Sequence, residues 1–219
     1  PSPHTGIHSI RSEFPMRMMM CLITTATLLA IAGGSFARPQ QEQPMAHSVE
    51  VEGVNADYRQ QLLQLAQADQ QIRADVLKDY TPQQLQNDPG SARALALKIH
   101  ASQQQNQQAL SALMAKYGFP DTAVAGSDGA HAGFLVAQHA ADRTFRDAFL
   151  TGIQAAAEKG RYSKEDLALY VDRNRVLSGQ PQLYGTQHKA DGSLFDVEQP
   201  ERLQQRRAEM GLPPDVAAH

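Results

Sequence analysis

Apolar residues recur at intervals of three and four along two long stretches of this chain, which is the spacing of one face of an α-helix. The second stretch begins near Ser91 and ends at Gly118, where glycine favours a helix end. The first follows Asn55, a good N-cap, and carries Tyr58, Leu62, Leu65, Ile72, Val76 and Tyr80. We therefore expect two long helices that form an antiparallel hairpin and act as a scaffold.

Asp69 interrupts the first apolar stripe. It either lies at the edge of the stripe and reaches water or is buried with a partner, because an unpaired buried charge costs on the order of several kcal/mol. Arg73, one turn further along, is the nearest candidate partner. The amide-rich run at residues 103–108 of the second helix is interpreted as a solvated helix face, or else as a polar contact between helices.

Shorter helical patterns fill the rest of the chain. Ser163 opens a capping box for a helix that extends through Leu177, and residues 201–210 form a last helix before Gly211. Before Ser163, two helices carry Phe134 to His139 and Phe145 to Ile153, and a glycine-containing turn is expected over residues 124–130.

Asp191-Gly192 is a strong hairpin signal, with strands expected at about residues 184–188 and 193–197. The predicted fold class is therefore mainly α, a helical bundle of about six helices, with one small β-hairpin near the C-terminus.

Residues 16–37 have the composition of a secretory signal peptide, with Arg17 before an apolar run and Ser35-Phe36-Ala37 as a small-x-small cleavage site. We expect cleavage near Ala37 and an exported protein, in the periplasm or outside the cell. Residues 1–15 are interpreted as an upstream extension that is not native.

The remaining chain divides in two. Residues 38–53 are rich in Pro and Gln and are expected to form a flexible leader. Residues 54–219 are expected to form a single helical domain, with the scaffold hairpin at 54–120 and the polar motifs at 126–214.

Cys21, inside the predicted signal, is the only cysteine, so the processed protein would hold neither a disulfide nor a cysteine-ligated metal. The net charge of −3 favours no bulk attraction to nucleic acid. No stretch after the signal reaches the roughly twenty apolar residues of a membrane span. No cofactor is indicated, and the oligomeric state is left open.

A series of polar residues lies within patterns that otherwise indicate packed helices. The series comprises Gln138, His139, Asp142, Asp172, Arg173, Gln182, Tyr184 and Gln187. In order along the chain these residues belong to QHAAD, DR and QPQLYGTQ, and the segment ERLQQRRAEMGLPP follows. This order resembles a widespread bacterial family known only as a domain of unknown function, with the motifs QHxxD, DR, QxYGTQ and ERxxxRxxxGLPP.

The resemblance covers residues 126–214, and Asp69-Gln70-x-x-Arg73 is similar to a DQxxR piece of the same family. It departs at Asn174 and Arg175, where the family pattern is usually apolar. The resemblance implies a shared site without an established activity, so the chemistry has to come from the residues.

His139 and Asp142 are the candidate catalytic residues. His139 can move a proton near neutral pH, and Asp142, three residues later, is expected on the same helical face, where it would orient the imidazole. The alternative is a histidine that a carboxylate satisfies for structural reasons. His131, His139, Asp142 and His188 do not have the spacing of a metal site, so no metal is expected.

Arginine side chains match carboxylate and phosphate groups with two parallel hydrogen bonds, so Arg173 and Arg206 are candidate anion ligands. The full predicted ligand-binding set is Arg173, Asp172, Gln182, Tyr184, Gln187 and Arg206. Alternatively, Asp172 and Arg173 are structural ion-pair residues, and the two glutamines satisfy backbone groups. Gly185 permits an unusual backbone angle or a close ligand approach.

Three functions are consistent with these residues. The first is a binding module for a small polar or anionic ligand, with His139, Arg173, Tyr184 and Gln187 around one pocket. The second is a hydrolase with His139 as general base and Asp142 as its orienting acid. The third is a purely structural polar network that specifies the fold.

Overall fold

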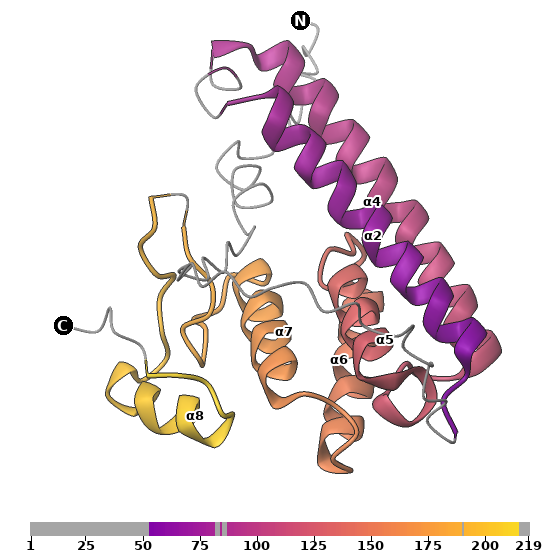
Figure 1. Cartoon of the computed structure of the whole chain (residues 1–219). Helices are drawn as coiled ribbons and strands as arrows, with labels where there is room; N and C mark the ends of the chain where they lie inside the picture. Colours follow the sequence, from indigo (N-terminus) through magenta and orange to yellow (C-terminus); the bar gives the residue numbers. More distant parts are fainter. Residues whose placement is uncertain (1–52, 82–83, 85–86, 190, 215–219) are drawn as a thin grey trace, which may run out of the picture.

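The computed structural model of the chain describes residues 53–81, 84, 87–189 and 191–214. This part is mainly helical, as predicted, and holds six α-helices (Figure 1). The expected upstream extension, signal peptide and leader fall on residues 1–53 and lie outside the described residues, apart from Gly53. Within the described part, no helix is both long and apolar enough to cross a lipid bilayer.

Helices α2 (Ala56–Asp79) and α4 (Pro89–Tyr117) form the predicted antiparallel hairpin (Figure 1). Asn55 caps α2, because its side chain accepts a hydrogen bond from the Tyr58 N–H at 2.9 Å. The Tyr58 hydroxyl donates to the carbonyl of Gly118 at 3.0 Å, so the start of α2 lies beside the end of α4.

Helix α5 (Thr122–Ala137) lies against α2, and α6 (Arg143–Glu158) and α7 (Lys164–Leu177) continue the bundle (Figure 1). The turn expected over residues 124–130 is instead a kink inside α5 at Gly126, whose φ is 73°. Gly129 of α5 faces α2, where an added Cβ would lie 3.5 Å from the Cα of Arg59, an ordinary van der Waals distance.

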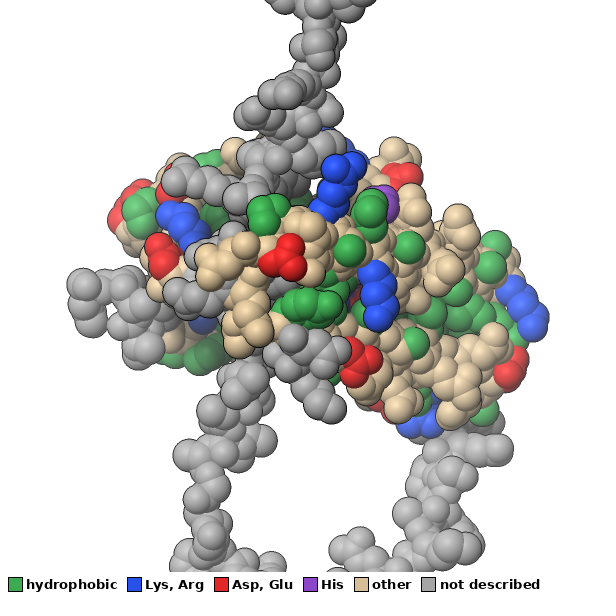
Figure 2. Space-filling model, turned by 90° about the horizontal axis from the view of Figure 1, so that it is seen from above, with side chains coloured by type: hydrophobic (Ala, Val, Ile, Leu, Met, Phe, Trp, Pro, Cys, Tyr) green, Lys and Arg blue, Asp and Glu red, His purple; other side chains and the backbone are tan. Residues whose placement is uncertain are grey.

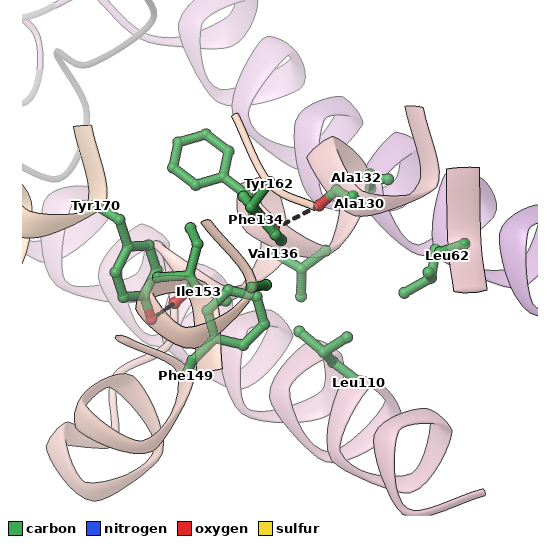
Figure 3. Packing of buried hydrophobic residues seen from close by; sticks show 14 of the residues in the cluster. Leu62, Leu110, Ala130, Ala132, Phe134, Val136, Phe149, Ile153, Tyr162 and Tyr170 are labelled. Carbon is green, nitrogen blue, oxygen red and sulfur yellow. Dashed lines mark hydrogen bonds between the residues drawn. The ribbon is translucent and has the colours of Figure 1, made fainter. Parts of the chain in front are cut away.

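The main hydrophobic core joins the hairpin to α5, α6 and α7 (Figure 3). Phe149 and Tyr170 pack with ring centroids 5.3 Å apart, and Phe134 contacts the same tyrosine ring at 6.2 Å. The buried hydroxyl of Tyr162 donates to the carbonyl of Ala130 at 2.8 Å, so this polar group is satisfied within the core (Figure 3).

A second, smaller apolar cluster occupies the far half of the hairpin. It consists of Val76 on α2 with Leu95 and Ile99 on α4, and Tyr80 packs against it. Along both helices, buried polar residues separate this cluster from the main core: Asp69 on α2, and Gln103 and Asn106 on α4. We call these three residues the polar layer.

The C-terminal part contains a short 3-10 helix η1 (Pro200–Arg202) and α8 (Leu203–Glu209), close to the predicted last helix. The two predicted strands do not appear as strands in the described residues. Instead, this segment makes two isolated bridges, Gln182 with Val197 and His188 with Leu194. Gly192, with φ at 85°, lies between His188 and Leu194 in the sequence and donates its N–H to the carbonyl of Lys189 at 3.0 Å.

Charged side chains are spread over the face of the molecule shown in Figure 2, where Lys and Arg side chains alternate with Asp and Glu. A surface that attracts nucleic acid through charge gathers many basic side chains. This face carries no such broad basic area, and the absence of a nucleic-acid partner stays a prediction.

Candidate functional site

His139 lies just beyond the end of α5, not within a helix. The helix ends at Ala137 with Gln138 as its C-cap, and the chain then turns. The His139 side chain is only 4% exposed, and its Nδ1 is 2.6 Å from Oδ2 of Asp69. A contact between residues 70 positions apart therefore holds the imidazole.

Asp69 is the centre of the polar layer. It is 1% exposed, so the structure realises the alternative in which this residue is buried with partners. Arg73 Nε lies 3.3 Å from Oδ2, and the side-chain amide of Asn106 donates to Oδ1 at 3.2 Å. With His139, these partners come from α2, α4 and the end of α5, and together they satisfy a carboxylate that burial alone would destabilise.

Arg73 was the partner expected from the sequence, whereas Asn106 and the buried Gln103 were missed. They belong to the amide-rich run that was interpreted as a solvated helix face or else as a polar contact between helices, and Asn106 makes such a contact with Asp69. Residues 104, 105 and 108 of that run are exposed, so the solvated-face interpretation holds for only part of it. The signal that could have found the other two is their spacing: Ile99, Gln103, Asn106 and Leu110 continue one buried stripe.

The surroundings of His139 keep its ring neutral. Burial is the main reason that its pKa is lowered to about 4, and the positive charges of Arg73 and Arg173 lower it further, against the hydrogen bond to Asp69. Burial by itself would raise the pKa of Asp69, but its contacts with His139 and Arg73 outweigh that effect and the pKa is lowered. At neutral pH the pair is therefore an ionised carboxylate and a neutral imidazole.

Asp142 does not orient His139, contrary to the sequence expectation. Its side chain caps α6 by accepting a hydrogen bond from the Phe145 N–H at 3.0 Å, and the residue is exposed. The expectation assumed one helix through both residues, but α5 ends at Ala137. The carboxylate that contacts the imidazole is Asp69.

Asp172 and Arg173 are both buried on α7 and serve different neighbours. Arg173 Nε donates to the carbonyl of Gln138 at 2.8 Å, next to His139. Asp172 turns toward the segment at residues 182–187, which we call the YGTQ loop. Adjacent helical residues do not share a face, so the two side chains belong to separate clusters.

The Asp172 carboxylate organises the YGTQ loop. It accepts hydrogen bonds from the backbone N–H groups of Leu183 at 2.6 Å, Tyr184 at 3.1 Å and Thr186 at 3.0 Å, and from the Thr186 hydroxyl at 2.9 Å. Burial raises the pKa of Asp172, and these hydrogen bonds act against that rise. Gly185 supplies the positive φ, 63°, that lets the chain wrap around one carboxylate.

Gln182 and Gln187 are buried within the same loop. The side-chain amide of Gln182 donates to the carbonyls of Gln187 at 3.0 Å and Phe195 at 2.9 Å, and its oxygen accepts the Gln187 N–H at 2.8 Å. The structure thus realises, for Gln182, the alternative in which a glutamine satisfies backbone groups.

Arginines from α8 and α7 bind the carbonyl groups of this region. Arg206 Nε donates to the carbonyl of Leu183 at 2.6 Å, and Arg207 Nη1 donates to that of Tyr184 at 2.6 Å. Arg175 donates to the carbonyl of Pro181 at 2.6 Å and pairs with Glu198. Arg206, expected to bind an anionic ligand, is therefore engaged with backbone oxygens.

Asn174 and Arg175 are the two residues at which the chain departs from the family pattern, and the contacts of Asn174, like those of Arg175, explain its presence. It is buried and accepts a hydrogen bond from Arg146 Nε at 3.1 Å. Arg146 in turn donates to the carbonyls of Ala140 and Ala141, at 2.8 Å each, just after His139. This pair ties α6 and α7 to the turn that carries the histidine.

Apart from Asp142, the predicted site residues fall into two clusters, and α7 contributes Arg173 to one and Asp172 to the other. We define the His139 cluster as Asp69, Arg73, Asn106, His139 and Arg173. The loop cluster consists of Asp172, Gln182, Tyr184, Gln187 and Arg206. Tyr184 donates its N–H to Asp172 and accepts a hydrogen bond from Arg207 at its carbonyl, and both partners lie outside the His139 cluster.

His131 pairs with Asp166, Nδ1 lying 2.9 Å from Oδ2, and so lies apart from His139 in its contacts. Within the described residues, no group of three or more His, Cys, Asp and Glu side chains is arranged to hold a metal ion.

Lowering the pH should destabilise the protein through His139. Because the pKa of His139 is about 4 when folded and near 6.5 when unfolded, the unfolded state binds more protons between these values. The free energy of unfolding should therefore fall by about 3 kcal/mol from pH ~7 to pH ~4 through this residue. This loss in the free energy of unfolding is measured by urea unfolding of the wild type and of His139→Asn at both pH values. Asparagine can still donate to Asp69 but does not titrate, so the variant should lack this loss. Equal losses in both proteins would contradict the assignment.

Replacing Asp172 should loosen the YGTQ loop. In Asp172→Asn, an NH2 group would face backbone N–H donors in place of an acceptor, so we expect a loss of about 2–4 kcal/mol in the free energy of unfolding. Chemical denaturation measures this loss. The matched control is Asp147→Asn on the exposed face of α6, which should change stability by no more than about 0.5 kcal/mol. Similar small effects at both positions would refute the role of Asp172.

Comparison with known proteins gives a family but no activity. No curated protein matches the chain, and no solved structure does. The model of a family of unknown function, DUF6624, matches residues 56–217, which include both clusters. Because the match spans most of the sequence, the chain belongs to the DUF6624 family of unknown function.

Proposed function

We propose that this protein is an exported binding module that holds a small polar or anionic ligand at the His139 cluster. The observation that carries the proposal is the His139 imidazole, which Asp69 holds at 2.6 Å and which stays neutral beside the positive charges of Arg73 and Arg173. Such a cluster offers a ligand both positive charge and a hydrogen-bonding ring nitrogen.

The position of the cluster is consistent with a ligand that enters at one edge of the hairpin. Arg73 keeps 15% of its side chain exposed, whereas Asp69 and His139 keep only 2% and 4%. A ligand would therefore meet the arginine first and the imidazole more deeply. Burial strengthens the electrostatic contacts made there, because the surroundings screen charge less than water does.

A hydrolase with His139 as general base is the second candidate, and the Asp69–His139 contact favours it. In that arrangement a carboxylate orients the imidazole through Nδ1, with Asp69 in the role expected for Asp142. However, a general base works best when its pKa lies near the operating pH, and a pKa of about 4 makes His139 a weak base. We therefore favour binding over catalysis.

The purely structural function suits the loop cluster better than the His139 cluster. Asp172, Gln182 and Arg206 bind backbone groups, which is the work of a network that specifies a fold. For this reason our proposed ligand site excludes these three residues. Tyr184 and Gln187 belong to the same loop cluster, and the proposed site does not require them.

Anion binding should raise the melting temperature. A ligand that binds only the folded state stabilises it in proportion to the logarithm of its concentration over Kd. We expect acetate or inorganic phosphate, compared with chloride at equal ionic strength, to raise the Tm of the wild type and to have a much smaller effect on Arg173→Gln.

Arg143→Gln is the matched control, because Arg143 lies on the surface of α6 with 72% of its side chain exposed. This variant should respond to anions as the wild type does. An equal anion response in Arg173→Gln and Arg143→Gln would show that the binding is not at this cluster, and no response in the wild type would reject anion binding there.

Export is the part of the proposal that rests on residues 16–37 alone. When the whole chain is expressed in a bacterial host, the recovered protein should begin near Arg38 and be found in the periplasm or the medium. Mass spectrometry of each fraction measures this. An intact Met16 terminus in a cytosolic fraction would overturn it.

A further inference from the structure

The contact with Asp69 determines which nitrogen of His139 carries the hydrogen. An ionised carboxylate only accepts hydrogen bonds, so the Nδ1 that lies 2.6 Å from Asp69 must be the protonated nitrogen. A neutral imidazole has a single N–H. The second nitrogen, Nε2, therefore presents a lone pair and is a hydrogen-bond acceptor.

Two neighbouring groups in the cluster, the Asn106 amide and Arg173 Nε, are directed elsewhere than to this lone pair. The side-chain amide of Asn106 is directed to Asp69, at 3.2 Å, and Arg173 Nε is directed to the carbonyl of Gln138, at 2.8 Å. Within the described residues, the Nδ1 contact with Asp69 is the hydrogen bond that the His139 side chain makes. A ligand that enters the cluster would thus meet an acceptor next to positively charged arginines.

We propose that the ligand carries a hydrogen-bond donor, a hydroxyl or N–H group, next to its carboxylate or phosphate. The acidic group would bind beside Arg73 and Arg173, and the adjacent donor would bind His139 Nε2. This inference rests on the proposed function, because it specifies the ligand of that same cluster.

A simple anion fits this arrangement less well than a hydroxy acid. A bound carboxylate without a neighbouring donor would exclude water from His139 Nε2 and leave this acceptor without a hydrogen bond. A buried acceptor without a donor is unfavourable. The added hydroxyl of a 2-hydroxy acid removes that cost. A site built to bind a hydroxyl discriminates against the analogue that lacks it.

Matched pairs of anions test the inference without any mutation. Lactate and propionate differ by one hydroxyl. Glycerol 3-phosphate and 1,3-propanediol phosphate also differ by one, the hydroxyl on the carbon next to the phosphate ester, so the two pairs distinguish carboxylate from phosphate ligands. Binding is measured from the rise in Tm across a concentration series at constant ionic strength. In the wild type, the hydroxylated member of at least one pair should bind about threefold to tenfold more tightly.

His139→Asn provides the second arm. Its amide can still donate to Asp69, but it has no group at the position of Nε2, so both members of a pair should bind equally. Equal binding of both members in the wild type would overturn the inference and leave anion binding intact. Binding of none of the four anions would instead overturn the proposed function, and the inference with it. Discrimination that persists in His139→Asn would assign the donor contact to another residue.

Discussion

The buried carboxylate of Asp69 is the constraint on which the His139 cluster depends. A charge placed between two apolar clusters of a helical hairpin is unfavourable unless every neighbouring group compensates it. Arg73, Asn106 and His139 do so from two helices and one turn. The same contact joins the turn after α5 to the hairpin, because His139 follows the helix end at Ala137 and lies against Asp69 of α2.

A second buried carboxylate, Asp172, plays the corresponding role for the C-terminal part. It collects the N–H groups of the YGTQ loop, while Arg206 and Arg207 collect the carbonyl groups on the other side. The loop therefore needs no sheet to satisfy its backbone. Helix α7 connects the two clusters, since Arg173, next to Asp172, contacts the carbonyl that precedes His139.

Local signals in the sequence were enough to predict α2, α4 and α7, but not the first half of α5, where a turn was expected. The period of apolar residues, Asn55 and Ser163 as caps, and Gly118 as a stop predict elements close to those observed. The predicted strands do not appear in the described residues, where an isolated antiparallel bridge joins His188 to Leu194. Asp172 and the arginines of α8 bind the backbone of the YGTQ loop instead, and no local pattern shows such distant partners. Asp142 failed similarly, because its spacing from His139 has meaning only inside a continuous helix. Asp69 was open to two interpretations until its distant partners were known.

The central claim is that His139 is neutral, with its hydrogen on Nδ1 and a lone pair on Nε2. Nitrogen NMR of histidine-labelled protein, with His139→Asn used to assign the signals, tests this claim directly, since protonated and unprotonated ring nitrogens resonate in well-separated ranges. We expect one protonated and one unprotonated nitrogen for His139 at neutral pH, unchanged down to about pH 5 because its pKa is about 4. A doubly protonated ring at neutral pH, or a hydrogen on Nε2 in place of Nδ1, would contradict the account.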